Sequence, residues 1–199
     1  MKHLFFSGVI LGIAGAAQAH ESHEPTSLPA HPDRIVAAGQ GTEVDNPFHP
    51  VELLLSHEES QGAVTIYKFT LPPKNPGSPP HTHSREDEYF YVLSGRLDVL
   101  VDGDVRQLEP GDFAVLNRGH THMFWNGSDS ETELLMTTTG GSFEAFMSSA
   151  GPQIAAEKPA TPDEAGAIIA RLAAEHGITI SMAEMPEEAA RFYAPPAPE

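Results

Sequence analysis

The stretch that decides the fold is residues 81–95, with the sequence His-Thr-His-Ser-Arg-Glu-Asp-Glu-Tyr-Phe-Tyr-Val-Leu-Ser-Gly. Its two histidines are two positions apart, so they point to the same face of a strand. A second stretch, residues 111–126, contains a further histidine just before an aromatic strand pattern. Three neutral imidazoles and one carboxylate form a donor set that suits a divalent transition metal. The sequence therefore predicts one metal site, with the ligands His81, His83, Glu88 and His122.

The residues around these ligands predict a series of short antiparallel strands. Residues 87–93 are rich in aromatic and branched side chains, and residues 96–101 alternate polar with apolar ones. Asp102-Gly103 indicates a two-residue hairpin, because both turn positions need a positive φ. Strands and turns this regular are typical of an antiparallel sandwich or barrel, which places the chain in the all-β class. Further strands are expected at residues 51–56, 63–71, 112–116, 121–126 and 133–139.

Side-chain alternation predicts which neighbours share the interior with the ligands. Phe90 should point inward with Glu88, and Phe124 should point inward with His122. Both phenylalanines are candidates for lining a substrate pocket, and packing in the core is the alternative. His120, two residues before His122, is a further candidate at the mouth of the site, with a surface position as the alternative. Side chains expected on the opposite faces, against a second sheet or a partner subunit, are Tyr89, Tyr91, Met123 and Trp125.

The two stretches resemble the paired motifs of the cupin superfamily. The first motif is His-x-His, four residues, Glu, six residues, Gly, and residues 81–95 match it completely. The second motif matches residues 111–126 in its two glycines, its histidine and its final asparagine. Two positions depart from the pattern. Asn75 stands where a glycine is usual, with Gly77 two residues later, and Asn117 stands where a proline is usual.

This resemblance covers residues 48–140 and implies an antiparallel double-stranded β-helix, the jelly-roll barrel of cupins, with a C-terminal helical extension. The chain looks most like the quercetinase-like dioxygenases, in which the glutamate, here Glu88, is both a ligand and the base that accepts a substrate proton. The resemblance implies one divalent transition metal (iron, manganese, nickel, cobalt, copper or zinc), an enolisable or aromatic small-molecule substrate, and a homodimer. Two other functions stay open: an oxygen-independent cupin lyase or isomerase, and a non-catalytic periplasmic protein that binds a small molecule or a metal.

The charge of the chain argues against two kinds of binding partner, and its lack of cysteine excludes disulfide bonds. The 199-residue chain carries a formal net charge of −17, so nucleic acid and anionic membrane surfaces would repel it. It contains no cysteine, which rules out disulfides. A chain of this length is sufficient for one domain with a sizeable core.

The N-terminal residues have the pattern of a secretory signal. In residues 1–19 a short positive start precedes an apolar stretch that ends in Ala17-Gln18-Ala19. Cleavage is expected after Ala19, which predicts a periplasmic or secreted protein. The segment that follows, residues 20–45, contains several prolines and is expected to be mobile, ahead of a barrel over residues 46–142.

The last quarter of the chain, residues 143–193, is predicted to be a helical extension. Residues 161–164 form a capping box with proline at the first helical position, and Gly177 is a good terminator. They delimit a helix of about fifteen residues, which either covers an open sheet edge or closes over the metal site as a lid. Residues 194–199 are expected to be disordered. Connecting side chains that can line the barrel mouth are Phe143, Phe146 and Met147.

Overall fold

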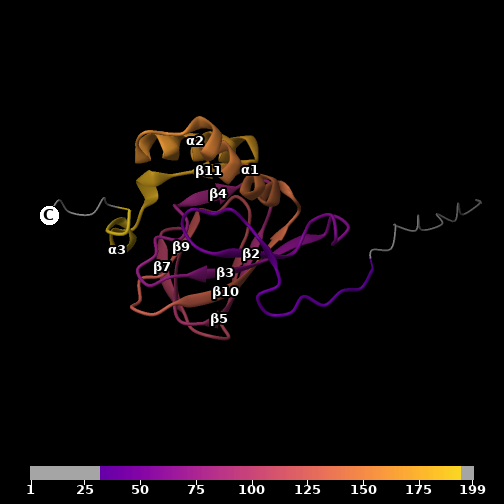
Figure 1. Ribbon diagram of the computed structural model, residues 1–199. Helices are drawn as coiled ribbons and strands as arrows, with labels where there is room; N and C mark the ends of the chain where they lie inside the picture. The colour runs from indigo at the N-terminus through magenta and orange to yellow at the C-terminus, as the bar shows by residue number, and fades with distance from the viewer. Residues whose placement is uncertain (1–31, 194–199) are drawn as a thin grey trace, which may run out of the picture. The chain divides into compact units, whose positions relative to one another are not determined.

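Two antiparallel sheets form the framework of residues 32–193, the part of the chain that the computed structural model describes (Figure 1). The first sheet has the strand order β1 (Thr42–Glu43), β2 (Val51–Leu55), β3 (Val64–Leu71), β10 (Thr132–Thr139), β5 (Glu88–Ser94) and β8 (Phe113–Leu116). The second has the order β11 (Ile178–Ile180), β4 (His81–His83), β9 (His122–Trp125), β6 (Leu97–Val101) and β7 (Asp104–Leu108). The predicted all-β class and double-stranded β-helix are confirmed, and each predicted strand lies within one residue of its expected ends.

The core lies between the sheets because side chains alternate along the strands. In β3 and β10 every second residue is buried. The two strands pair in register, so that Leu134 lies opposite Phe69 and Met136 lies opposite Tyr67. The buried row is polar at one end, where Thr65 lies opposite Thr138. This polar end is where β5 begins.

The helix predicted from the capping box is confirmed as α2 (Pro162–Glu175). The Thr161 hydroxyl accepts a hydrogen bond from the Glu164 amide at 3.2 Å, which satisfies one of the amides left free at a helix start. Gly177 follows the helix with a φ of +79°, the left-handed conformation that glycine adopts without strain.

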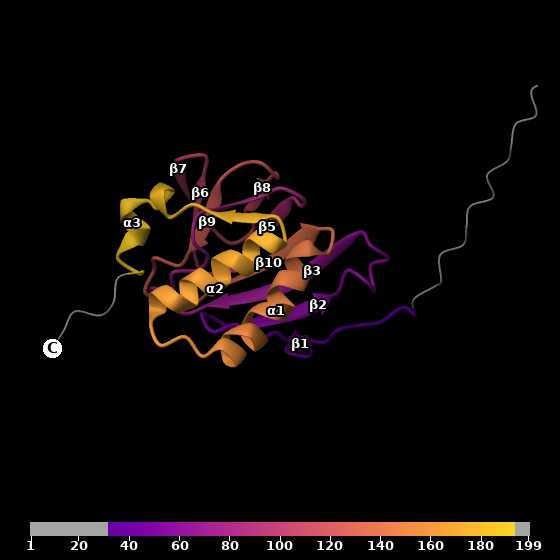
Figure 2. The same ribbon diagram turned by 90° about the horizontal axis from the view of Figure 1, so that it is seen from above.

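A second helix, α1 (Ser142–Glu157), lies almost entirely within the predicted helical extension, but its bounds were not predicted. Pro152 lies inside this helix. Tertiary packing offsets its cost, since one side of α1, including Phe143 and Met147, is buried against the core. Both views show α1 and α2 side by side over the end of the barrel where β4 and β11 run (Figures 1 and 2).

The last described residues cover the outer face of the second sheet. Met123 and Trp125 point away from the barrel interior, as predicted, and residues near the C-terminal end of the described chain cover them in place of a second sheet. They form a separate buried cluster under the segment from Met185 to Tyr193, which contains the one-turn helix α3 (Glu187–Ala190) after the 3₁₀ turn η1 (Met182–Glu184). On the first sheet Tyr91 stays exposed on the outer face.

The structure adds a short strand to the segment that was expected to be mobile. β1 lies within residues 20–45 and pairs with the edge strand β2. The predicted signal, residues 1–19, and the predicted disordered tail, residues 194–199, lie outside the described residues. Between residues 32 and 193 no helix has the length and apolar character needed to cross a bilayer.

A substitution at Gly77 tests the close contact between the segment before β4 and strand β9. Its φ is +61°, and an added Cβ would overlap the carbonyl oxygen of Phe124. Gly77→Ala should therefore lower the free energy of unfolding by about 3 kcal/mol, because backbone must move as well as adopt a strained φ. The matched control is Gly103→Ala, at a φ of +87° with nothing within 4 Å, which should cost about 1 kcal/mol. Equal losses in urea unfolding would contradict the packing argument.

His49 should make stability depend on pH. Its ring is 6 % exposed and lies 5.0 Å from the ring of Phe69. Burial lowers the pKa of His49 from 6.5 to about 4, and the neighbouring Pro50 carbonyl opposes this only partly. Between these pH values the unfolded chain takes up a proton that the folded chain does not. The free energy of unfolding should thus fall by up to about 3 kcal/mol as the pH drops from 6.5 to 4.

The measurement is urea unfolding at several pH values, with His49→Phe as the comparison. This variant keeps an aromatic ring beside Phe69 and should show a flatter pH dependence across the same window. Identical slopes for the two proteins would show that His49 does not titrate in this way.

Candidate metal centre

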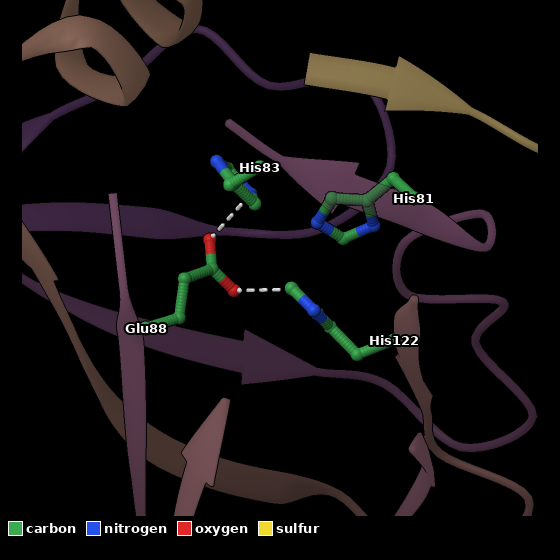
Figure 3. Close-up of side chains that lie close together, drawn as sticks. All are labelled: His81, His83, Glu88 and His122. Atoms are coloured by element: carbon green, nitrogen blue, oxygen red, sulfur yellow. Dashed lines mark hydrogen bonds and ion pairs between the residues drawn. The ribbon is translucent and has the colours of Figure 1, made fainter. Parts of the chain in front are cut away.

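Four side chains from three strands meet inside the barrel (Figure 3). His81 and His83 lie on β4, Glu88 begins β5 and His122 begins β9. One ligand atom from each lies within 4.8 Å of the others, and no side chain of the four is more than 6 % exposed. The structure therefore brings the predicted ligands together, three from one sheet and one from the other.

Strand pairing sets the positions of these ligands. His81 lies directly opposite His122 where β4 pairs with β9. His83 is two residues further along β4 and points to the same face. Glu88 comes from the other sheet, where it lies opposite Thr138 of β10. The site therefore exists only when the two sheets pack against each other.

Backbone carbonyls orient two of the imidazoles. The Nδ1 atom of His81 donates to the Pro79 carbonyl at 2.8 Å, and Nδ1 of His122 donates to the His120 carbonyl at 3.1 Å. A hydrogen bond at Nδ1 leaves Nε2 to face a metal, which is the usual arrangement for a ligand histidine. Burial, reinforced by His122 and opposed by Glu88, lowers the pKa of His81 to about 3, so this ring stays neutral.

The Glu88 carboxylate lies between the other two imidazoles. Its Oε1 is 3.1 Å from Nε2 of His83, and its Oε2 is 3.2 Å from Nε2 of His122. Burial acts to raise the pKa of Glu88, but the two histidines overcome this and hold the pKa well below its ordinary value. Burial likewise acts to lower the pKa of His83, and Glu88 overcomes it and raises that pKa. Glu88 is therefore ionised although it is fully buried.

Two of these buried atoms lack a hydrogen-bond partner, which indicates that the residues fit a metal ion. Nε2 of His83 and Oε1 of Glu88 are close to each other but are not aligned as a hydrogen bond. Leaving buried polar or charged atoms unsatisfied is costly, and a divalent cation would satisfy both. The donor types, the burial and the two atoms without hydrogen bonds all indicate that this cluster can hold a metal ion.

The loop before His122 is tied to both other ligand segments. The Gly119 amide donates to the His83 carbonyl at 2.8 Å. The Arg118 guanidinium forms a two-pronged ion pair with Asp87, with its Nη2 at 2.8 Å and its Nε at 3.0 Å from the carboxylate oxygens. Since Asp87 precedes Glu88 directly, these contacts hold the four ligands in place beyond the strand pairing itself.

Glu86, which the sequence analysis did not single out, anchors α1 beside the site. Its carboxylate is buried and accepts hydrogen bonds from the amides of Ser142 at 2.6 Å and Phe143 at 2.7 Å. A negative charge is favourable at a helix N-terminus. The anchored helix places the Phe143 ring 5.7 Å from the ring of His83. The sequence held no signal for this, because Glu86 looks like one more charge in a charged turn.

β11 closes the edge of the sheet beside the ligands. It pairs with β4, so that Ile178 lies opposite His83 and Ile180 lies opposite His81. A helix was expected to cover an open sheet edge. The short strand β11, which follows α2, covers the edge at β4 instead. Three residues are too few to give a recognisable strand pattern, which is why the sequence analysis missed it.

The three further candidates lie in different surroundings. Phe90 and Phe124 point inward, as predicted, and pack against each other in the apolar core with their rings 5.3 Å apart. His120 instead lies on the surface, with Nδ1 2.6 Å from Oδ2 of Asp102. Of the two positions considered for His120, at the mouth of the site or on the surface, the structure shows the surface one, because residues 117–120 form a turn and the strand alternation begins only at His122.

Comparison with known proteins gives one family match and partial relatives. Residues 67–138 match the model of the family described as "Cupin domain". A 60-residue segment, 30 % of this chain, is 40 % identical to "Probable oxidoreductase patJ" of Penicillium expansum and covers 18 % of that protein. A 50-residue segment, 25 % of this chain, is 34 % identical to an uncharacterized protein of Aquifex aeolicus and covers 41 % of it. The chain thus spans less than half the length of these relatives.

Among solved structures, a "predicted oxalate decarboxylase" from Thermotoga maritima is similar over 54 % of this chain and 99 % of that one, with 23 % identity and a TM-score of 0.48. The matched residues include all four ligands and strands of both sheets. Residues 67–138 are therefore similar to a cupin domain, and they contain a buried cluster of three histidines and one glutamate that can hold a metal ion.

Proposed function

We propose that this protein is a metal-dependent oxidoreductase of the dioxygenase type, acting on an enolisable or aromatic small molecule. The observation that carries the proposal is the buried set of His81, His83, Glu88 and His122, with two unpaired atoms in it. The partial likeness to a probable oxidoreductase supports redox chemistry over an oxygen-independent lyase or isomerase. Aromatic side chains near the ligands suit an apolar substrate.

Each residue of the site has a separate role in the proposed reaction. A bound transition metal supplies Lewis acidity and a centre for electron exchange. His81 and His122 are held by backbone carbonyls, so their rings need no rearrangement to act as ligands. Glu88 is ionised and can accept the proton of a substrate hydroxyl as well as offer an oxygen to the metal. Burial excludes bulk water from these groups.

Oxygen uptake tests the proposal directly. The protein would be loaded separately with iron, manganese, cobalt, nickel, copper and zinc, and challenged with flavonols and with simple enediols. Uptake that requires both a metal and a substrate supports the dioxygenase. Full metal loading with product formation in the absence of oxygen would show an oxygen-independent enzyme instead. Full loading with no turnover, but with stabilisation by a bound compound, would show a binding protein.

Removing two ligands should abolish metal binding. His81→Ala combined with His83→Ala leaves one imidazole and one carboxylate, too few donors to hold the ion. Metal analysis after dialysis should find about one equivalent in the wild type and none in the double variant. His120→Ala is the control, since this exposed side chain lies outside the cluster and its loss should leave the metal content unchanged. A full equivalent retained by the double variant would refute the site.

Glu88→Gln separates the base from the ligand. The amide has nearly the same shape and can still offer an oxygen to the metal, but it cannot accept a proton at neutral pH. We expect a folded protein with some metal and a turnover number about 100-fold to 10,000-fold lower. Glu133→Gln is the matched control, because Glu133 pairs with Lys68 on the outer face of β10. Full activity in Glu88→Gln would rule out the base role.

A further inference from the structure

Two buried hydroxyl groups near the metal cluster have no partner. Among residues 32–193, six buried side-chain atoms lack a hydrogen bond: His57 Nδ1, Tyr67 Oη, His83 Nε2, Glu88 Oε1, Arg96 Nε and Thr138 Oγ1. A metal ion accounts for the atoms of His83 and Glu88. It does not account for Tyr67 and Thr138, although both lie in the same end of the barrel.

Strand register places Thr138 beside Glu88 and Tyr67 on the same inward face of a nearby strand. Thr138 lies directly opposite Glu88 in the pairing of β10 with β5. It also lies opposite Thr65 in β3, and Tyr67 is two residues further along β3 on the same inward face. The Phe143 ring contacts both Tyr67, at 5.9 Å, and the ligand His83, at 5.7 Å. One aromatic ring thus bridges Tyr67 and the metal cluster.

The Tyr67 hydroxyl is a donor without an acceptor. The side chain is 1 % exposed, and burial, together with the carboxylates of Glu144, Glu86 and Glu88 in that order, raises its pKa far above the usual value. It therefore keeps its proton. Two of those carboxylates are engaged by other donors: Glu144 by the Thr65 hydroxyl at 2.9 Å, and Glu86 by the first amides of α1.

A buried hydroxyl without a partner is unfavourable unless something binds to it. We propose that the hydroxyl of Tyr67, with that of Thr138 beside it, binds an oxygen atom of the small molecule on which the metal site acts. This rests on the proposed function and narrows its substrate class. The substrate carries a second oxygen group in addition to the one that faces the metal ligands, and Tyr67 fixes its orientation.

The surrounding charge decides what this second group is. Three carboxylates lie within electrostatic reach of the Tyr67 hydroxyl, so a second negative group would be repelled there. A neutral carbonyl or hydroxyl accepts the hydrogen bond without that penalty. The site therefore favours hydroxyketones and diols over keto acids, and Tyr67 is a positioning residue for specificity.

The test compares Tyr67→Phe with the wild type, using protein loaded with zinc so that no redox turnover occurs. The probes are hydroxyacetone, which is neutral, and pyruvate, which has similar size and a negative charge. Tyr67→Phe should bind the same amount of zinc and bind hydroxyacetone about fivefold to tenfold more weakly, the loss expected for one hydrogen bond. Tyr67→Phe should weaken the binding of pyruvate by a smaller factor, because the pyruvate carboxylate is attracted to the zinc and repelled from the carboxylates around Tyr67.

A second readout needs no metal. Because Tyr67→Phe removes an unpaired hydroxyl, the free energy of unfolding of the metal-free protein should stay equal or rise. The matched control is Tyr193→Phe, whose hydroxyl donates to the Pro76 carbonyl at 3.1 Å. That variant should unfold more easily and bind hydroxyacetone as the wild type does.

Failure of this inference is distinguishable from failure of the metal site. A wild type that binds no zinc refutes the metal site and the inference that depends on it. With zinc bound, three results refute the role of Tyr67 alone: unchanged affinity of Tyr67→Phe for hydroxyacetone, an equal loss of affinity for pyruvate, or no binding of either probe to the wild type. A loss of stability in Tyr67→Phe would show that the hydroxyl has a partner in the folded chain, which also refutes it.

Discussion

The buried, ionised carboxylate of Glu88 is the constraint on which the rest of the structure depends. A charge removed from water needs compensation, and Glu88 finds it in imidazoles that belong to the opposite sheet. The two sheets must therefore meet at one exact place and orientation. Two further interactions reinforce this contact: the ion pair between Asp87 and Arg118, and the hydrogen bond from the Gly119 amide to the His83 carbonyl. Packing of the barrel and assembly of the metal site are one requirement.

The interior of the barrel is divided into an apolar part and a polar part. Phe69, Leu71, Val92 and Leu134 fill the first, and their burial stabilises the fold. The polar part holds the metal ligands together with the hydroxyls of Thr65, Tyr67 and Thr138. Such a concentration of polar groups contributes little to stability when it is incompletely paired. The four ligands in this part can hold a metal ion.

The C-terminal extension contributes residues to the surroundings of the metal ligands. Helix α1 is anchored by Glu86 and brings Phe143 against both His83 and Tyr67. Helix α2 leads into β11, which pairs along the strand that carries His81 and His83. The ligands are consequently almost inaccessible to water. The extension thus contributes to the burial of the ligands.

The sequence by itself determined the barrel, its strands, the helix α2 and the four members of the cluster. Strand alternation, turn residues and helix capping depend on neighbouring residues in the chain, so they can be recognised in the sequence. It did not delimit α1, which lies within the predicted helical extension and contains Pro152. Nor did it identify β11, Glu86 or the hydroxyl of Tyr67 that lacks a hydrogen bond. It left His120 open between the mouth of the site and the surface, and the turn before His122 places it on the surface. Each of these depends on which distant segment lies opposite, and only the tertiary structure decides that.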